Sequence, residues 1–115
     1  MKKLLLLTIY FLSIFQFDLQ AQCSSPHCHV IYADGMNSFT PANQTIALGD
    51  TVVWINTGGF HNVNGGWATF PNNPDSIGPY PSSGLIGPGN LIGGKIFTVP
   101  GLYDYQCDPH VGMGM

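Results

Sequence analysis

The side chains best suited to chemistry lie in the last nine positions of the chain and at one position far upstream. Cys107 and His110 are separated by two residues, and Met113 and Met115 follow them, while His61 comes at the end of another predicted strand. A thiolate, two imidazoles and a thioether are the ligands of a trigonal copper site with a long axial Met, whereas Ca²⁺ and Mg²⁺ prefer oxygen. These residue types therefore predict one type 1 copper centre that alternates between Cu(II) and Cu(I).

Other interpretations of the same side chains remain open. Cys107 could form a disulfide with Cys23 or Cys28, and zinc also accepts cysteine and histidine. Zinc sites rarely include methionine, so the two methionines favour copper. A Cys–His pair could serve as a nucleophile, but a thiol flanked by soft ligands is better explained by a metal. We therefore expect no catalytic residue and no enzyme activity, unless the chain is part of a longer enzyme.

The apolar pattern predicts the strands that must position these ligands. Residues 51–56 are β-branched and almost continuously apolar, which is typical of a central strand covered on both faces, with Trp54 in the core. In residues 102–107, aromatic residues and Cys107 alternate with polar ones, which predicts a half-buried strand that ends with Cys107 pointing inward. Shorter runs predict strands at 30–33, 45–48 and 95–99, and a strand or its entry at 60–63.

Residues 64–94 form a long region dominated by Gly, Pro, Asn and Ser, with Asp75 as its only charge. Spaced apolar residues predict a loop packed by its own side chains, with one or two short strands or a helical turn. The chain has 15 glycines, 9 prolines and only 8% charged residues. Short strands joined by frequent turns indicate an all-β protein, an antiparallel sandwich or barrel.

The start of the chain has the pattern of a secretory signal peptide, residues 1–21. Two lysines precede an uncharged apolar run at 4–17, and cleavage is expected after Ala21. The run is shorter than the roughly 20 residues of a spanning helix, and Asp18 interrupts it. We therefore expect a periplasmic or secreted protein that is not stably inserted in a membrane after cleavage.

Charge in the remaining chain excludes one class of partner. Beyond residue 21 the only basic side chain besides histidine is Lys95, against five aspartates, and the chain contains no Glu or Arg. Phosphate binding needs clustered Lys or Arg. Nucleic acid is therefore not an expected partner. Separately, we expect the domain to be a monomer.

Residues 22–38 are predicted to be an N-terminal segment that contains the first strand. In an oxidising compartment Cys23 and Cys28 could form a disulfide, which would leave Cys107 as the odd thiol. Alternatively, Cys28 could bind a second metal together with His27 and His29. Both interpretations stay open on the sequence alone.

Four motifs together resemble the cupredoxins of the plastocyanin group, small copper electron carriers with a Greek-key β-sandwich. The motifs are Gly-Asp-Thr-Val-Val-Trp at 49–54, His-Asn-Val at 61–63, Gly-x-Tyr-x-Tyr at 101–105, and Cys-x₂-His followed by Met at 107–115. The resemblance covers residues 39–115 and is loosest in 64–94. It implies a cupredoxin domain over 39–115 and transfer of single electrons.

The resemblance also implies a role for each site residue. His61, Cys107 and His110 would be the equatorial ligands and a methionine the axial one. Met115 has the plastocyanin-like spacing and is favoured, whereas Met113 has the shorter spacing of amicyanin-like loops. Further, Asn62 would form hydrogen bonds between the two ligand loops, and Tyr103 would pack inside the sandwich.

Partners and alternatives follow from the same resemblance. Redox proteins would dock transiently near His110, among Val111, Gly112 and Met113. Gln106 and the lack of an acidic cluster do not support a photosynthetic role. A copper delivery or storage protein, or a copper module of a longer secreted protein, are the alternatives. Cupredoxins follow the axial Met with a final strand, so we expect more sequence beyond Met115.

Overall fold

The computed structural model describes residues 23–115, and the predicted signal peptide lies outside this part of the chain. Its larger sheet is built around β3 (Thr51–Asn56), in which every residue after the first is buried. This confirms the predicted central strand. On either side lie β1 (Cys28–Ala33) and β6 (Leu91–Ile96), and β2 (Phe39–Thr40) pairs with the outer edge of β1.

β1 runs parallel to β3, whereas the other strand pairs are antiparallel. The predicted antiparallel arrangement therefore holds for three of these four pairs, and the β1–β3 pair is the exception. A parallel pair needs a connection of about a dozen residues or more, because the chain must return to the end from which it started. Residues 34–50 provide that length and include β2 on the way.

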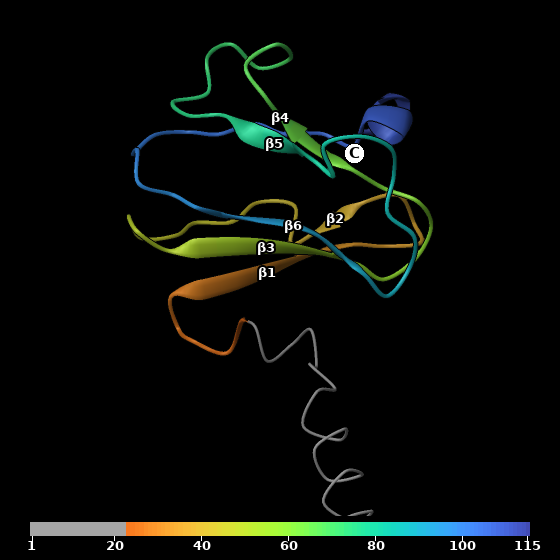
Figure 1. Ribbon diagram of the computed structural model, residues 1–115, viewed down its shortest axis with the longest axis horizontal. Coiled ribbons are helices and arrows are strands. Elements are labelled where there is room, and N and C mark those ends of the chain that lie inside the picture. Colours follow the sequence, from red (N-terminus) through yellow and green to blue (C-terminus); the bar gives the residue numbers. More distant parts are fainter. Residues whose placement is uncertain (1–22) are drawn as a thin grey trace, which may run out of the picture.

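A second, smaller sheet lies over the first and consists of β4 (Val63–Gly65) and β5 (Ile77–Tyr80) (Figure 1). The core fills the space between the two layers, and its largest fully buried apolar side chains are Trp54, Ile31 and Ile77. This arrangement confirms the predicted β-sandwich. The 3₁₀ helix η2 (Asp108–Met113) lies between the core residues Cys107 and Met115 and carries part of the candidate site.

Trp54 is the centre of the core. Its side chain is only 1% exposed and meets the ring of Tyr105 edge-on at a centroid distance of 5.5 Å. The ring of Tyr80 lies 6.2 Å away on the same core. The prediction that Trp54 is a core residue is confirmed.

The third long strand begins earlier than predicted. The sequence indicated 95–99, but β6 covers Leu91–Ile96 and ends before Phe97. Glycines inside a strand weaken its sequence signal, and β6 contains two. A Cβ at Gly93 would lie 2.4 Å from the ring of Tyr80, so the close approach of that ring requires glycine.

Residues 45–48 were predicted to form a strand and do not. The backbone of Ala47 instead closes a turn with Asp50, which donates its N–H to Ala47 O at 3.0 Å and accepts the Ala47 N–H on its carboxylate at 3.2 Å. This segment and residues 99–103 line an open, mainly apolar cavity of about 500 Å³.

Residues 102–107 keep the predicted alternation but are not a ladder strand. Tyr105 and Cys107 face the core, yet only Gln106 pairs with another chain segment, at Asn64. The side chain of Asn73 replaces a neighbouring strand, because it donates to Asp104 O and accepts from Asp104 N, both at 2.8 Å. The hydrogen bonds of the Asp104 backbone are thus formed with an amide side chain. The alternation of side chains in the sequence does not reveal this.

Cys23 and Cys28 form a disulfide, with Cα atoms 5.1 Å apart, and Cys107 is a free, buried thiol. This confirms the predicted pairing and removes both the disulfide alternative for Cys107 and the metal site through Cys28. Within residues 23–115, no helix is both long and apolar enough to cross a membrane.

Candidate metal centre

Two loops at one end of the sandwich deliver the three predicted equatorial ligands. His61 lies between β3 and β4, where its backbone forms two hydrogen bonds with Ile86, at 3.0 and 2.9 Å. Cys107 is the N-cap of η2, and His110 lies within that helix. The backbone N–H of His110 donates to Cys107 O at 3.1 Å, so the short helix fixes the spacing of the last two ligands.

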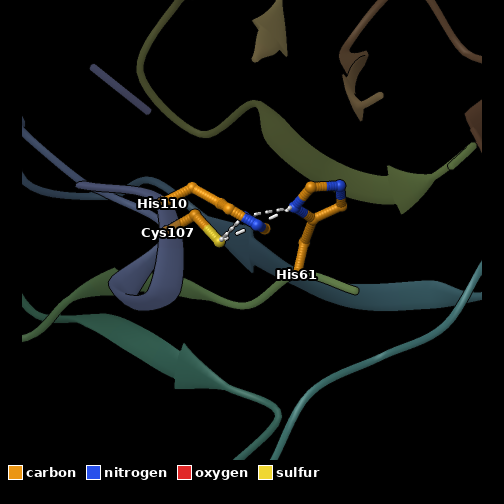
Figure 2. A group of neighbouring side chains, drawn as sticks. All are labelled: His61, Cys107 and His110. Carbon is orange, nitrogen blue, oxygen red and sulfur yellow. Dashed lines mark hydrogen bonds between the residues drawn. The ribbon is translucent and has the colours of Figure 1, made fainter. Parts of the chain in front are cut away.

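Figure 2 shows the three side chains pointing toward one common space. Cys107 Sγ lies 3.4 Å from His110 Nδ1 and 3.7 Å from His61 Nδ1, and the two Nδ1 atoms are 3.2 Å apart. An ion bound at about 2.0 Å to nitrogen and 2.3 Å to sulfur in one plane would separate its donors by roughly 3.5 to 3.7 Å. The observed triangle therefore fits a trigonal metal.

Hydrogen bonds define which nitrogen of His61 can bind the metal. Its Nε2 faces two backbone carbonyls, Gly58 O at 2.6 Å and Asp34 O at 3.0 Å. Carbonyls only accept hydrogen bonds, so Nε2 carries the proton and Nδ1 keeps the free lone pair. His61 is fully buried, and these two contacts hold its ring in the orientation that ligation needs.

A polar bridge joins the two ligand loops beside the site. Asn62 donates to the Asp108 carboxylate at 2.8 Å and accepts the Asp108 backbone N–H at 2.8 Å, which confirms the bridging role implied for Asn62. Asn64 and Gln106 also donate to this carboxylate, at 3.0 and 2.9 Å. Burial opposes ionisation of Asp108, but these hydrogen bonds outweigh it and lower its pKa.

Asp108, Asn64 and Gln106 were missed as supporting residues by the sequence reasoning. Each of these polar residues lies two positions from another residue of the site. Asn64 follows Asn62, and Asp108 lies between Gln106 and His110. Because i and i+2 side chains of extended chain share one face, this spacing was the available signal. The signal is weak, since exposed strand faces are generally polar.

The two methionines occupy different environments. Met115 is 6% exposed and belongs to the same core cluster as Cys107, and its carbonyl accepts the Cys107 N–H at 3.0 Å. Met113 is 69% exposed, and its sulfur accepts a hydrogen bond from the Asn37 amide at 3.3 Å. Burial beside the thiol favours Met115 as the axial ligand, which stays a prediction.

Copper binding should depend on pH through Cys107. Burial raises the pKa of the Cys107 thiol, although N–H groups of Asn62 and His110 oppose the shift. The thiol therefore carries a proton near neutral pH, and a metal must displace it. We expect apparent copper affinity to rise about tenfold from pH 7 to 8, measured by competition with a chelator of known pH dependence. Affinity that does not change over this range would contradict the expectation.

Comparison with known proteins relates the whole described chain to copper proteins. The family described as copper binding proteins, plastocyanin/azurin family, matches residues 23–115. A plastocyanin of Scenedesmus fuscus is 36% identical over 78 residues, which is 67% of this chain and 79% of the relative. A plastocyanin of Ulva prolifera is 35% identical over 83 residues, 71% of this chain and 84% of the relative.

A bacterial protein shows a similar relationship. A pseudoazurin-like protein of Rhizobium leguminosarum bv. viciae is 41% identical over 83 residues, which is 71% of this chain and 49% of that protein. The chain is thus similar to proteins from two algae and from a bacterium.

Proposed function

The chain belongs to the plastocyanin/azurin family of copper-binding proteins, and we propose that it carries single electrons between redox partners outside the cytoplasm. Copper is its cofactor, and one type 1 ion would be held by His61, Cys107, His110 and Met115. Copper supplies the one-electron couple, Cu(II)/Cu(I). The protein is proposed to be a carrier rather than an enzyme.

The observation that carries the proposal is the fixed triangle of three donors. His61 is held by two carbonyls, and Cys107 and His110 are joined through the backbone of η2. A planar set of one thiolate and two imidazoles suits both oxidation states of copper tolerably. Because packed and hydrogen-bonded ligands move little, the protein adds little reorganisation to an electron transfer.

Copper loading tests this function directly. The loaded domain should show an intense thiolate-to-copper charge-transfer band in the visible region and a reversible one-electron couple. A colourless protein that holds only Cu(I), without a reversible couple, would instead support copper delivery or storage. His61 and Cys107 are both fully buried, which favours a resident ion over exchangeable cargo.

A set of exposed apolar side chains surrounds the half-buried His110 and forms the proposed docking surface, named here the apolar rim. Asn37 of the neighbouring turn contacts Met113, and Ile86 pairs with His61, so these loops meet at the same end of the sandwich. The rim consists of Met36, Phe60, Leu85, Val111 and Met113. Small apolar surfaces suit brief association, and electrons would leave through the ring of His110.

Electron self-exchange between two copies of the protein provides a test of this surface. Val111→Asp should slow self-exchange at least about tenfold, because a carboxylate would then lie on both docking faces. NMR line broadening in mixtures of the Cu(I) and Cu(II) forms measures the rate. Leu48→Asp adds the same charge just before the start of β3, away from the rim, and should change the rate much less. Equal slowing by both variants would contradict the assignment.

The proposed location rests on the disulfide. Disulfides persist in oxidising compartments, and Cys23–Cys28 is formed. We therefore place the protein in the periplasm or outside the cell, with residues 1–21 as its signal peptide. The signal peptide itself stays a prediction from the sequence.

A further inference from the structure

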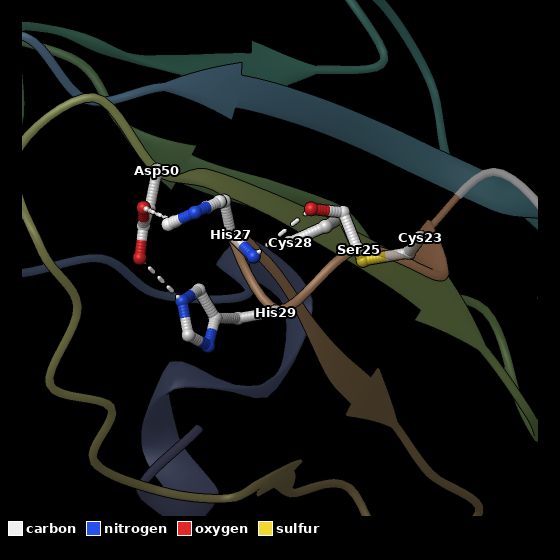
Figure 3. The surroundings of a disulfide bond; sticks show 6 residues. All are labelled: Cys23, Ser25, His27, Cys28, His29 and Asp50. Carbon is white, nitrogen blue, oxygen red and sulfur yellow. Dashed lines mark hydrogen bonds and ion pairs between the residues drawn. A yellow bond between two sulfur atoms is a disulfide. The ribbon is translucent and has the colours of Figure 1, made fainter.

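A second group of metal-binding side chains lies before the start of β3, at the opposite end of that strand from His61. Figure 3 shows the rings of His27 and His29 on two sides of the Asp50 carboxylate. His27 Nδ1 is 3.1 Å from Asp50 Oδ1, and His29 Nε2 is 2.8 Å from Asp50 Oδ2. The copper site uses none of these three residues.

The strand register explains why they meet. β1 pairs in parallel with β3, with Cys28 opposite Thr51, and the Thr51 N–H donates to His27 O at 2.9 Å. Asp50 therefore lies beside His27. His27 lies in the turn just before β1 and His29 lies in β1, and both rings contact the two oxygens of the same carboxylate. Two imidazoles placed in this way can reach one ion.

The carboxylate is fixed and almost buried. Only 7% of the Asp50 side chain is exposed, and its Oδ2 also accepts the Ala47 N–H. The disulfide between Cys23 and Cys28 ties the chain at the residue between the two histidines. His27 is the adaptable member, because 78% of its side chain is exposed and its ring can turn without displacing packed atoms.

We propose that His27, His29 and Asp50 bind one divalent ion of the Zn²⁺ or Cu²⁺ class, with water completing the coordination. Two imidazoles and a carboxylate suit these borderline ions, whereas Cu(I) prefers sulfur. Among residues 23–115, only His61, Cys107 and His110 already have all ligand atoms within 4.8 Å of one another. Binding at the second site therefore requires the ring of His27 to turn toward that of His29.

Zinc titration of the copper-loaded protein tests this site. Cu(I) first fills the Cys107 site under anaerobic conditions, and equilibrium dialysis with metal analysis then measures added Zn²⁺. One copper and one zinc per chain are expected. His27→Gln and His29→Gln should each weaken zinc binding more than about 100-fold, because loss of a direct ligand exceeds the loss caused by removing a supporting hydrogen bond.

A matched control removes a charge elsewhere. Asp75→Asn deletes one carboxylate, which pairs with Lys95 at 2.8 Å, and should leave zinc binding unchanged. The blue band after oxidation shows whether each variant is folded, and His27→Gln changes an exposed side chain that the fold does not need. Wild-type protein that binds no zinc, or histidine variants that bind it equally well, would overturn the proposal and leave the copper function untouched.

Discussion

Cys107→Ser is expected to abolish the intense visible band and to weaken Cu(I) binding more than about 100-fold. The thiolate supplies the charge-transfer transition and the softest bond to the metal. A serine hydroxyl is a harder donor that stays protonated near neutral pH. Absorption spectroscopy and copper competition measure the two effects. Because Cys107 is fully buried in the core cluster, the apo variant should be checked for folding by circular dichroism.

The matched control for this change is the double replacement of Cys23 and Cys28 by serine. It removes the disulfide, which stabilises the protein by about 2 kcal/mol in the chain-entropy model, but no ligand. The blue band should persist in this variant under conditions in which it folds. If Cys107→Ser keeps the band, Cys107 is not the thiolate ligand.

Trp54→Ala should have the largest effect on stability. The side chain is buried between both layers, and truncation of a buried tryptophan costs about 3–5 kcal/mol through lost transfer energy and the cavity that remains. Domains of this size are stable by only about 5–15 kcal/mol. Urea unfolding followed by circular dichroism should therefore show a midpoint far below that of the wild type, or an unfolded variant.

The other tryptophan is the control. Trp67 is 54% exposed, and its Nε1 donates one hydrogen bond to Asn73 O at 3.0 Å. Trp67→Ala should cost about 1 kcal/mol, the usual net contribution of one hydrogen bond. Equal losses of unfolding free energy in the two variants would show that Trp54 is not the centre of the core.

The cluster of His61, Cys107 and His110 could be predicted because its side-chain chemistry is rare and part of its spacing is local. Cys107 is the N-cap of the short helix that contains His110, so their separation in sequence fixes their separation in space. His61 was found through the strand motif that precedes it. In contrast, Asp50 joins His27 and His29 only through the register of a parallel strand pair, which no local pattern encodes.

Strands were predicted correctly where their own side chains favour a strand. They were missed or misplaced where contacts with distant residues decide the structure. β3 is apolar at its four central residues and was found with its bounds. β6 was misplaced, because Gly93 is required by the approach of Tyr80 and lowers the local strand signal. Residues 102–107 were predicted to be a strand because their side chains alternate as in a strand. The backbone of Asp104, however, forms its hydrogen bonds with the side chain of Asn73 and not with a neighbouring strand.

The side chain of Asn73 holds the segment that ends in Cys107 at its Asp104 backbone. A ladder would distribute its hold over many backbone bonds, but here two hydrogen bonds of a single side chain secure Asp104. Regions held by few contacts open at a lower free energy than the whole domain. Loss of the Asn73 hydrogen bonds would free the Asp104 backbone first, because Gln106 and Cys107 keep backbone hydrogen bonds to Asn64 and Met115. The segment that leads to Cys107 should therefore loosen at Asp104 before the thiol itself is displaced.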